Sequence, residues 1–335
     1  MPSRCTNLIR LALFVSLTLF SPALAATAGE RVRFAPKFVP GEVLRYRIES
    51  RTTTTGTTTT PIVNPEGGSR SSQAIHMVVR LETLGVSAAG KVRFRATYEK
   101  SSAESESDAL DLAASSSADR YNHLEGRSVE FTMEPDGQFS DFQNVGAAAA
   151  GQPVLGQPAP GQPAIDPVLA LLQGAVSDGT FPQKGVAIGE KWTSEQPIPG
   201  ALLSGLTRRT ESSYLRNEPC GSSAGSQASA VQPGQHPDDC AVILTHFEIL
   251  RRGSTHSDAT PDDYRRNGLR TSGTWTGSGE SLDSISLSSG LLVSSTDTNT
   301  QEMDYQITSA SSGSSIHHVG KVQSQSEVTL MPEQP

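Results

Sequence analysis

The sequence predicts a mainly β protein: a curved, half-barrel-like antiparallel sheet with one short helix and long low-complexity loops. Several segments alternate apolar and polar residues with a period of two, as strands with one buried and one solvated face do. One-sided strands that follow one another along the chain favour an antiparallel sheet with one covered face. Two C-terminal segments, 291–308 and 314–330, read as strands well beyond the usual length of about 5 to 6 residues. Long strands coil, so the sheet should curve strongly.

The first 25 residues have the order of a secretory signal peptide. Two arginines precede an apolar run from Leu11 to Phe20, and the small residues Ala23-Leu24-Ala25 follow, which predicts cleavage after Ala25. The run is about half of the roughly 20 residues that a membrane-spanning helix needs, and no later segment comes closer. We expect a soluble mature protein, periplasmic or extracellular, without a transmembrane segment. Cys5 precedes the apolar run, so it leaves with the signal.

Four segments in the first half of the mature chain have clear inward and outward faces. In KVRFRATYE, for example, Phe94 points to one side and Arg93 and Arg95 to the other. The predicted inward residues are Leu44, Tyr46 and Ile48; Ile75, Met77, Val79 and Leu81; Val92, Phe94, Ala96 and Tyr98; and Val129, Phe131 and Met133. A turn at Pro135-Asp136-Gly137 follows the last of these segments, and Ser288-Ser289-Gly290 predicts a hairpin before the long C-terminal strands.

One helix is predicted in IDPVLALLQGAVSDG, residues 165–179. Asp166 is suited to the N-cap and Pro167 to the first helical position, and apolar residues recur at helical spacing from Leu169 to Val176. This helix should cover part of the apolar face of the sheet.

Four biased segments are predicted to be flexible insertions in a single β-rich domain that spans residues 26–335. They lie near 52–72, 101–119, 146–166 and 220–240. Segments of this composition bury too little apolar surface to offset the entropy lost on ordering. The Gly-Gln-Pro repeat in the third segment leaves a boundary between two domains as the alternative.

Cys220 and Cys240 remain after signal cleavage, and an even pair in an exported chain predicts a disulfide. A closure of about 20 residues contributes roughly 3 kcal/mol in the chain-entropy model. A zinc site is the alternative, but it needs two further ligands, and only His236 is near in sequence.

The run Gly221-Ser222-Ser223-Ala224-Gly225 matches the pattern of a hydrolase nucleophile elbow, with Ser223 as the nucleophile. An elbow requires a strand before the serine and a helix after it. Pro233, Gly234 and Pro237 interrupt the chain after it, so no helix can start there. We interpret the run as a solvated loop.

Charge and motifs exclude several classes of function. The formal net charge is −8, and loss of the signal with its two arginines and no acid makes it −10, so we expect no nucleic-acid partner. The chain contains no Walker loop, dinucleotide fingerprint, H-E-x-x-H or metal-type Cys/His spacing. His317 and His318 would point to opposite faces of a strand and could not chelate one ion together. We therefore expect no metal, no cofactor and no enzymatic activity.

A series of short sequence features follows the signal peptide in a fixed order. They are Val39-Pro40-Gly41 before a first strand with Leu44 and Tyr46, Phe181-Pro182 after the predicted helix, Gly189-Glu190-Lys191-Trp192, Leu282-Asp283, and a Ser-Gly-Leu turn at 289–291. This order resembles uncharacterised secreted proteins of the bacterial cell envelope, whose fold is similar to the half-open β-barrels of periplasmic lipoprotein carriers. The resemblance implies a half-open barrel. This chain is much longer than those carriers, mostly in its low-complexity loops.

Two functional hypotheses from different classes follow. The first is a non-enzymatic extracytoplasmic binding or carrier-like protein that holds a lipid, or an apolar segment of an envelope protein, in the concave face of its sheet. The alternative is a structural or protein-interaction module of the envelope whose sheet is filled by its own side chains. The residues predicted to contact an apolar ligand are Ile75, Met77, Val79, Leu81, Val92, Phe94 and Tyr98. Trp275 is expected to pack, with a cavity-facing role as the alternative.

Overall fold

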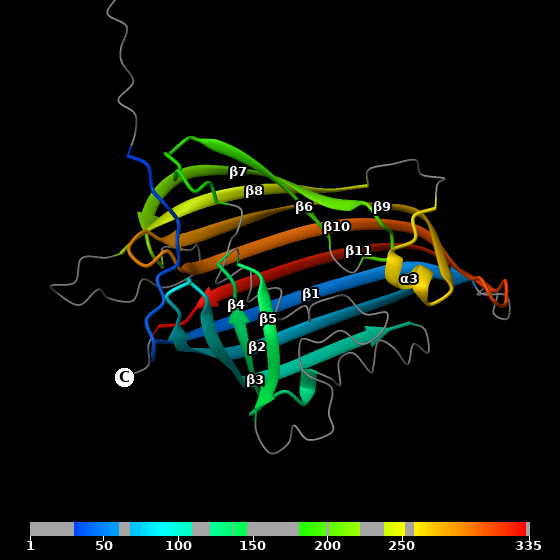
Figure 1. Cartoon of the computed structure of the whole chain (residues 1–335), viewed down its shortest axis with the longest axis horizontal. Coiled ribbons are helices and arrows are strands. Elements are labelled where there is room, and N and C mark those ends of the chain that lie inside the picture. Colours follow the sequence, from blue (N-terminus) through cyan, green and yellow to red (C-terminus); the bar gives the residue numbers. More distant parts are fainter. Residues whose placement is uncertain are drawn as a thin grey trace, which may run out of the picture.

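The computed structural model describes residues 30–59, 68–108, 121–135, 137–145, 181–198, 201–221, 238–251 and 258–332. Eleven strands form one antiparallel sheet in the order β5-β4-β3-β2-β1-β11-β10-β9-β8-β7-β6 (Figure 1). The strands are β1 (Val43–Thr59), β2 (Ser69–Val86), β3 (Val92–Ser107), β4 (Ser128–Met133), β5 (Phe139–Val145), β6 (Lys191–Pro197), β7 (Leu206–Pro219), β8 (Asp239–Arg251), β9 (Leu269–Ser286), β10 (Leu292–Ser309) and β11 (Ser315–Leu330). The mainly β fold is confirmed.

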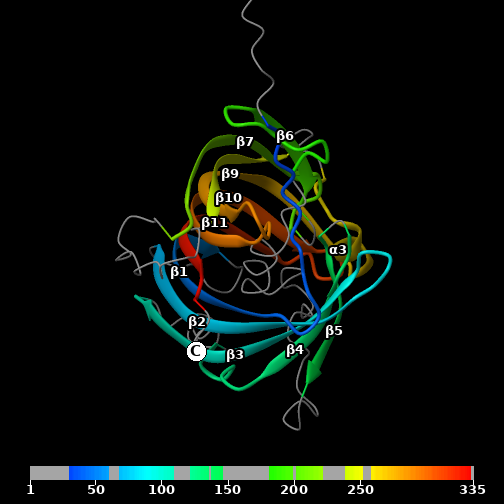
Figure 2. The ribbon, with the colours of Figure 1, turned by 90° about the vertical axis from the view of Figure 1, so that its left-hand side faces the viewer.

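The sheet curves into an open half-barrel. Seen along the strands, it wraps around an interior, and the short edge strands β5 and β6 do not pair with each other (Figure 2). The two long C-terminal strands predicted from the sequence are β10 and β11, each at least 16 residues long. The hairpin between β9 and β10 turns at Gly290, whose φ of 72° is in the left-handed region that glycine adopts without strain.

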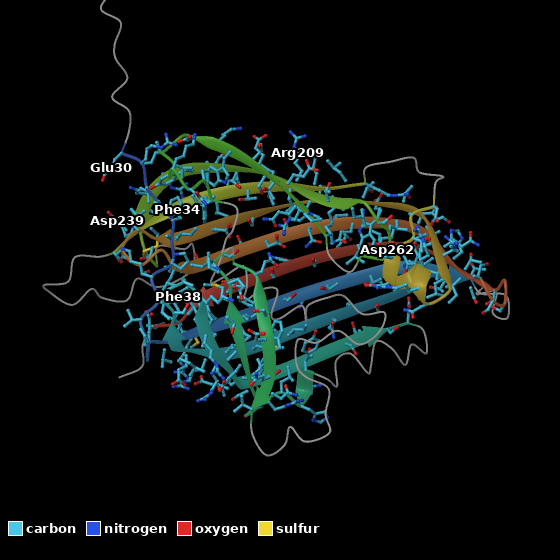
Figure 3. All side chains as sticks on the ribbon, in the orientation of Figure 1. Glu30, Phe34, Phe38, Arg209, Asp239 and Asp262 are labelled. Atoms are coloured by element: carbon cyan, nitrogen blue, oxygen red, sulfur yellow. A yellow bond between two sulfur atoms is a disulfide. The ribbon has the colours of Figure 1, made fainter. Side chains whose placement is uncertain are left out.

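The concave face is identified by the N-terminal segment that crosses it, residues 30–42. The ring of Phe34 packs on Tyr214 of β7 at 5.5 Å, and the ring of Phe38 packs on Phe94 of β3 at 4.9 Å. Because β3 and β7 belong to opposite arms of the sheet, one segment can reach both only from inside (Figure 2). Figure 3 labels both rings at the same end of the sheet, opposite the end near Asp262.

Two predictions about irregular segments are corrected. Thr52–Thr59 and residues 69–72 were expected in a flexible insertion but belong to β1 and β2, and residues 101–107 continue β3. Threonine is β-branched and favours extended backbone, and residues 52–59 pair in register with residues 317–324 of β11. The remaining parts of these segments, and all of 146–166, lie outside the described residues.

The helix predicted from Asp166 to Val176 also lies outside the described residues. A short helix that the sequence did not predict, α3 (Asp262–Arg266), packs near β9. Its two aspartates stand in the first turn and its two arginines in the last, the arrangement that the helix dipole favours.

Candidate ligand-binding face

All seven residues predicted to contact a ligand lie on the concave face, inside the hydrophobic core. Their exposed fractions range from 0% for Val79 and Phe94 to 8% for Ile75. Cross-strand register places Val79 beside Tyr98 and Leu81 beside Ala96, on the face that also carries Tyr46 and Ile48. The predicted orientation of these strands is therefore correct.

The chain itself covers this end of the concave face. Phe38, Phe181 and Leu291 belong to the same apolar cluster as the predicted residues, and backbone hydrogen bonds hold the covering segment in place: Val32 pairs with Val186, and the Lys37 amide donates to the carbonyl of Ser289 at 2.9 Å. The sequence does not predict this cover, because Phe34 and Phe38 belong to no periodic segment. An apolar surface packed in this way stabilises the fold at about 25 cal/mol per Å².

A row of small polar residues crosses the concave face next to this core. We call it the polar belt, and it runs through six neighbouring strands from β1 to β7. Its members, each directly opposite the next, are Ser50, Ser326, Asp297, Ser281, Thr245 and Ser212. Asp297 is the only charged residue among them. Five of the six side chains end in a hydroxyl, which both donates and accepts hydrogen bonds.

A chain of hydrogen bonds along the concave side of β10 ends at Asp297. The Trp275 indole Nε1 donates to Gln301 Oε1 at 3.1 Å, Gln301 Nε2 donates to Asn299 Oδ1 at 3.4 Å, and Asn299 Nδ2 donates to Asp297 Oδ1 at 3.3 Å. Burial raises the pKa of the Asp297 carboxyl above its ordinary value, while the bond from Asn299 and the positive charge of Arg208 lower it. The chain of amides thus presents a carboxylate that is poorly solvated.

Beyond the belt, apolar side chains lie among the polar ones on the concave face. Val322 and Met303 are half-buried, and Trp275 packs with a second cluster that contains Leu203 and Ile249. Trp275 therefore packs, as expected. We call Val322, Met303, Trp275 and Ile249 the far apolar strip.

Glycines on β9 provide the floor of this region. A Cβ at Gly279 would lie 2.6 Å from the Phe247 ring, and a Cβ at Gly277 would lie 3.1 Å from Ile249. The large side chains of β8 therefore lie flat over glycine backbone. Arg208 in turn lies over the Phe247 ring at 4.1 Å, a cation–π arrangement.

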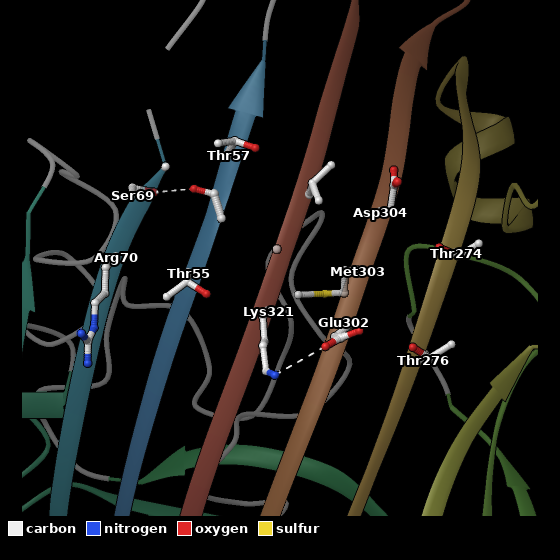
Figure 4. A pocket seen from close by; sticks show the side chains of 14 residues that line it. Thr55, Thr57, Ser69, Arg70, Thr274, Thr276, Glu302, Met303, Asp304 and Lys321 are labelled. Carbon is white, nitrogen blue, oxygen red and sulfur yellow. Dashed lines mark hydrogen bonds and ion pairs between the residues drawn. The ribbon is translucent and has the colours of Figure 1, made fainter. Parts of the chain in front are cut away.

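The outer face carries two shallow cavities, of about 730 and 750 Å³. Figure 4 shows the first, across β2, β1, β11, β10 and β9. Its outward side chains are Thr55, Thr57, Arg70, Thr274, Thr276, Glu302, Asp304, Val319 and Lys321. The second lies about four residues further along β1, β11, β10 and β9 and extends to β8, and Arg51, Thr53, Glu248 and Glu280 line it. Charges of both signs are present in each, and Lys321 pairs with Glu302 at 3.5 Å.

The remaining candidates carry no ligand chemistry in the described part of the chain. His317 pairs with Asp304 at 2.8 Å, and His318 is hydrogen-bonded to Thr58 at 3.0 Å, so the two rings have separate partners. Within the described ranges, no three His, Cys, Asp or Glu side chains are grouped as a metal site, and no helix combines the length and apolar character needed to cross a membrane. Ser223 and His236 lie outside these ranges.

The predicted disulfide is confirmed. Cys220 and Cys240 are bonded, with a Cα–Cα distance of 5.0 Å, at the facing ends of β7 and β8. Cys240 is fully buried. The bond closes the base of a loop, and such bonds persist in oxidising compartments.

The comparisons with known proteins place the chain in no family. No family model matches the chain, and no curated protein matches it. Among solved structures, it is similar to a chain from a study titled "Lipid-protein interactions in lipovitellin", at 12% identity and a TM-score of 0.42. The alignment covers 89% of this chain and 26% of that chain, so this chain spans about a quarter of the length of the protein it matches.

Proposed function

We propose that this protein is a non-enzymatic, extracytoplasmic binding protein of carrier type, which holds an apolar ligand against the concave face of its sheet. The observation that carries the proposal is the far apolar strip: Val322 and Met303 are half-buried on the concave face, outside the core that the N-terminal segment covers. Apolar side chains between polar neighbours are typical of ligand sites. The bacterial cell-envelope resemblance and the disulfide support an exported protein.

The ligand site thus differs from the one predicted from the sequence. The seven predicted residues are packed in the core of the same concave face, and in this proposal the far apolar strip supplies the contacts. The alternative hypothesis is a structural module whose sheet is filled by its own side chains. It fits only the end of the half-barrel near Phe34 and Phe38, where the chain covers the sheet.

A matched pair of variants on β11 tests this proposal. Val322 faces the concave side, whereas Val319 is 41% exposed on the outer face. Decanol at about ten times its Kd should stabilise the wild type by about 1.4 kcal/mol, which raises the Tm by about 2 °C for a chain of this size. Val322→Asp should abolish this shift and Val319→Asp should keep it.

The Tm of each variant without ligand shows whether it is folded. Loss of the shift in Val319→Asp alone would place binding in the outer cavity. A wild type with no shift for any alkyl probe would leave the structural module as the better account.

A further inference from the structure

We propose that the polar belt binds the positively charged head group of an amphiphile, an alkylammonium, with Asp297 as its counter-ion. This inference rests on the proposed function, because the alkyl chain of the same ligand would lie on the far apolar strip. It goes further in naming the class of head group and the residue that selects it.

The first support is the composition of the belt. An ammonium group has three N–H donors and no acceptor, so its site must present several acceptors close together. The Asp297 carboxylate stands directly between the hydroxyls of Ser281 and Ser326, on the two neighbouring strands. Opposite residues on adjacent strands have Cβ atoms about 5 Å apart, so a cation bound to the Asp297 carboxylate has a hydroxyl acceptor beside it on either neighbouring strand. The Ser281 hydroxyl donates to Asp283 Oδ2 at 3.1 Å, which leaves its oxygen free to accept.

The second support is the missing counter-ion of Asp297. The carboxylate accepts one hydrogen bond, from Asn299, and no Lys or Arg of the described residues lies within ion-pair distance of it. Arg208, the cation whose charge reaches it, is engaged over the Phe247 ring. A half-buried carboxylate without an ion partner is costly to maintain, and an incoming cation would offset that cost.

The third support is the distance between belt and strip. Ser326 in the belt and Val322 in the strip are four residue steps apart on β11, and a strand rises about 3.3 Å per residue. The gap is therefore about 13 Å, comparable with an extended decyl chain. A ligand with a head at Asp297 can thus place its tail on the strip.

The test compares two probes with the same chain, decylammonium and decanol, by isothermal titration at neutral pH. Wild type should bind decylammonium about tenfold more tightly than decanol. Asp297→Asn should remove this preference and leave decanol binding unchanged. The matched control is Asp304→Asn, because Asp304 lies on the outer face of the same strand; it should retain the preference.

The outcomes separate this inference from the proposed function. Equal binding of both probes by wild type, or a preference that survives in Asp297→Asn, would overturn the alkylammonium site while alkyl binding stands. A stronger preference for decanoate would identify an anionic ligand and would also overturn it. Failure of every alkyl probe would remove the proposed function, and this inference with it.

Discussion

Glu130 of β4 forms the most buried ion-pair group described on the outer face. Its side chain is 11% exposed and lies between Arg93 at 2.6 Å and Arg95 at 2.7 Å. The hydrogen bond from Arg95, and then the bond and charge of Arg93, hold the pKa of this carboxyl below its ordinary value, against the opposing effect of burial. Two charged donors on one carboxylate tie β3 to β4 beside the edge strand β5.

Replacement of this carboxylate should weaken the fold in a pH-dependent way. A depressed folded pKa means that the stabilisation is present above the unfolded pKa of about 4.3 and is lost as the pH falls through the folded pKa. Glu130→Gln should therefore lower the free energy of unfolding by about 1–2 kcal/mol at pH 7, with the difference from wild type shrinking below about pH 4. Urea unfolding at both pH values measures it.

Glu211→Gln is the matched control for this prediction. Glu211 pairs with Lys191 at 2.9 Å, but both side chains are at least half exposed, and such pairs contribute little. If both variants lose the same stability, or if the effect of Glu130→Gln does not change with pH, the account of this carboxylate is wrong.

At the scale of single elements, the N-terminal segment, residues 30–42, covers one end of the concave face, as a second layer of strands or helices would. The segment makes one isolated bridge, Val32 to Val186, yet it contributes the rings of Phe34 and Phe38 to the core. Its path depends on close approach: a Cβ at Gly290 would lie 2.5 Å from the carbonyl oxygen of Ala35. The hairpin glycine thus serves both its own turn and the segment that lies against it.

Phe38→Ala should lower the free energy of unfolding by about 2–3 kcal/mol, because it removes the ring that packs edge-on against Phe94. The adjacent Val39 is 61% exposed, so Val39→Ala should change stability by less than about 0.5 kcal/mol. Chemical denaturation of both variants checks this. Equal stabilities would mean that the segment does not cover the core.

Element by element, the sequence predicted the strands best where side chains alternate in hydrophobicity. The residues from Val92 to Tyr98 lie as the pattern indicated, because a half-buried strand must alternate. Thr52–Thr59 was misassigned, since an all-polar run gives no such contrast. The polar belt was not foreseen for a different reason: its members are unremarkable within each strand and form a row only through the register of six strands.

At the scale of the whole molecule, strand twist explains the two cavities on the outer face. Twisted, coiled strands give a barrel the shape of a hyperboloid, which is concave inside and narrows to a waist outside. Both outer cavities lie on the long central strands, where such a waist is expected.

Curvature also divides the concave face into three zones along the strands. The core near Phe34 and Phe38 is filled by the chain, the polar belt follows it, and the far apolar strip lies beyond. The disulfide between Cys220 and Cys240 lies at the filled end, where β7 and β8 meet the core. The packed core and the disulfide therefore share one end of the concave face, and the proposed ligand site lies at the other.

Native mass spectrometry of the protein exported by its own host tests the central claim most directly. The account predicts a non-covalent adduct of an aliphatic amphiphile, which dissociates on collisional activation to leave the bare, disulfide-bonded chain. Spectra that show only the bare chain, under conditions that preserve a reference lipid complex, would contradict the claim that the concave face holds an apolar ligand.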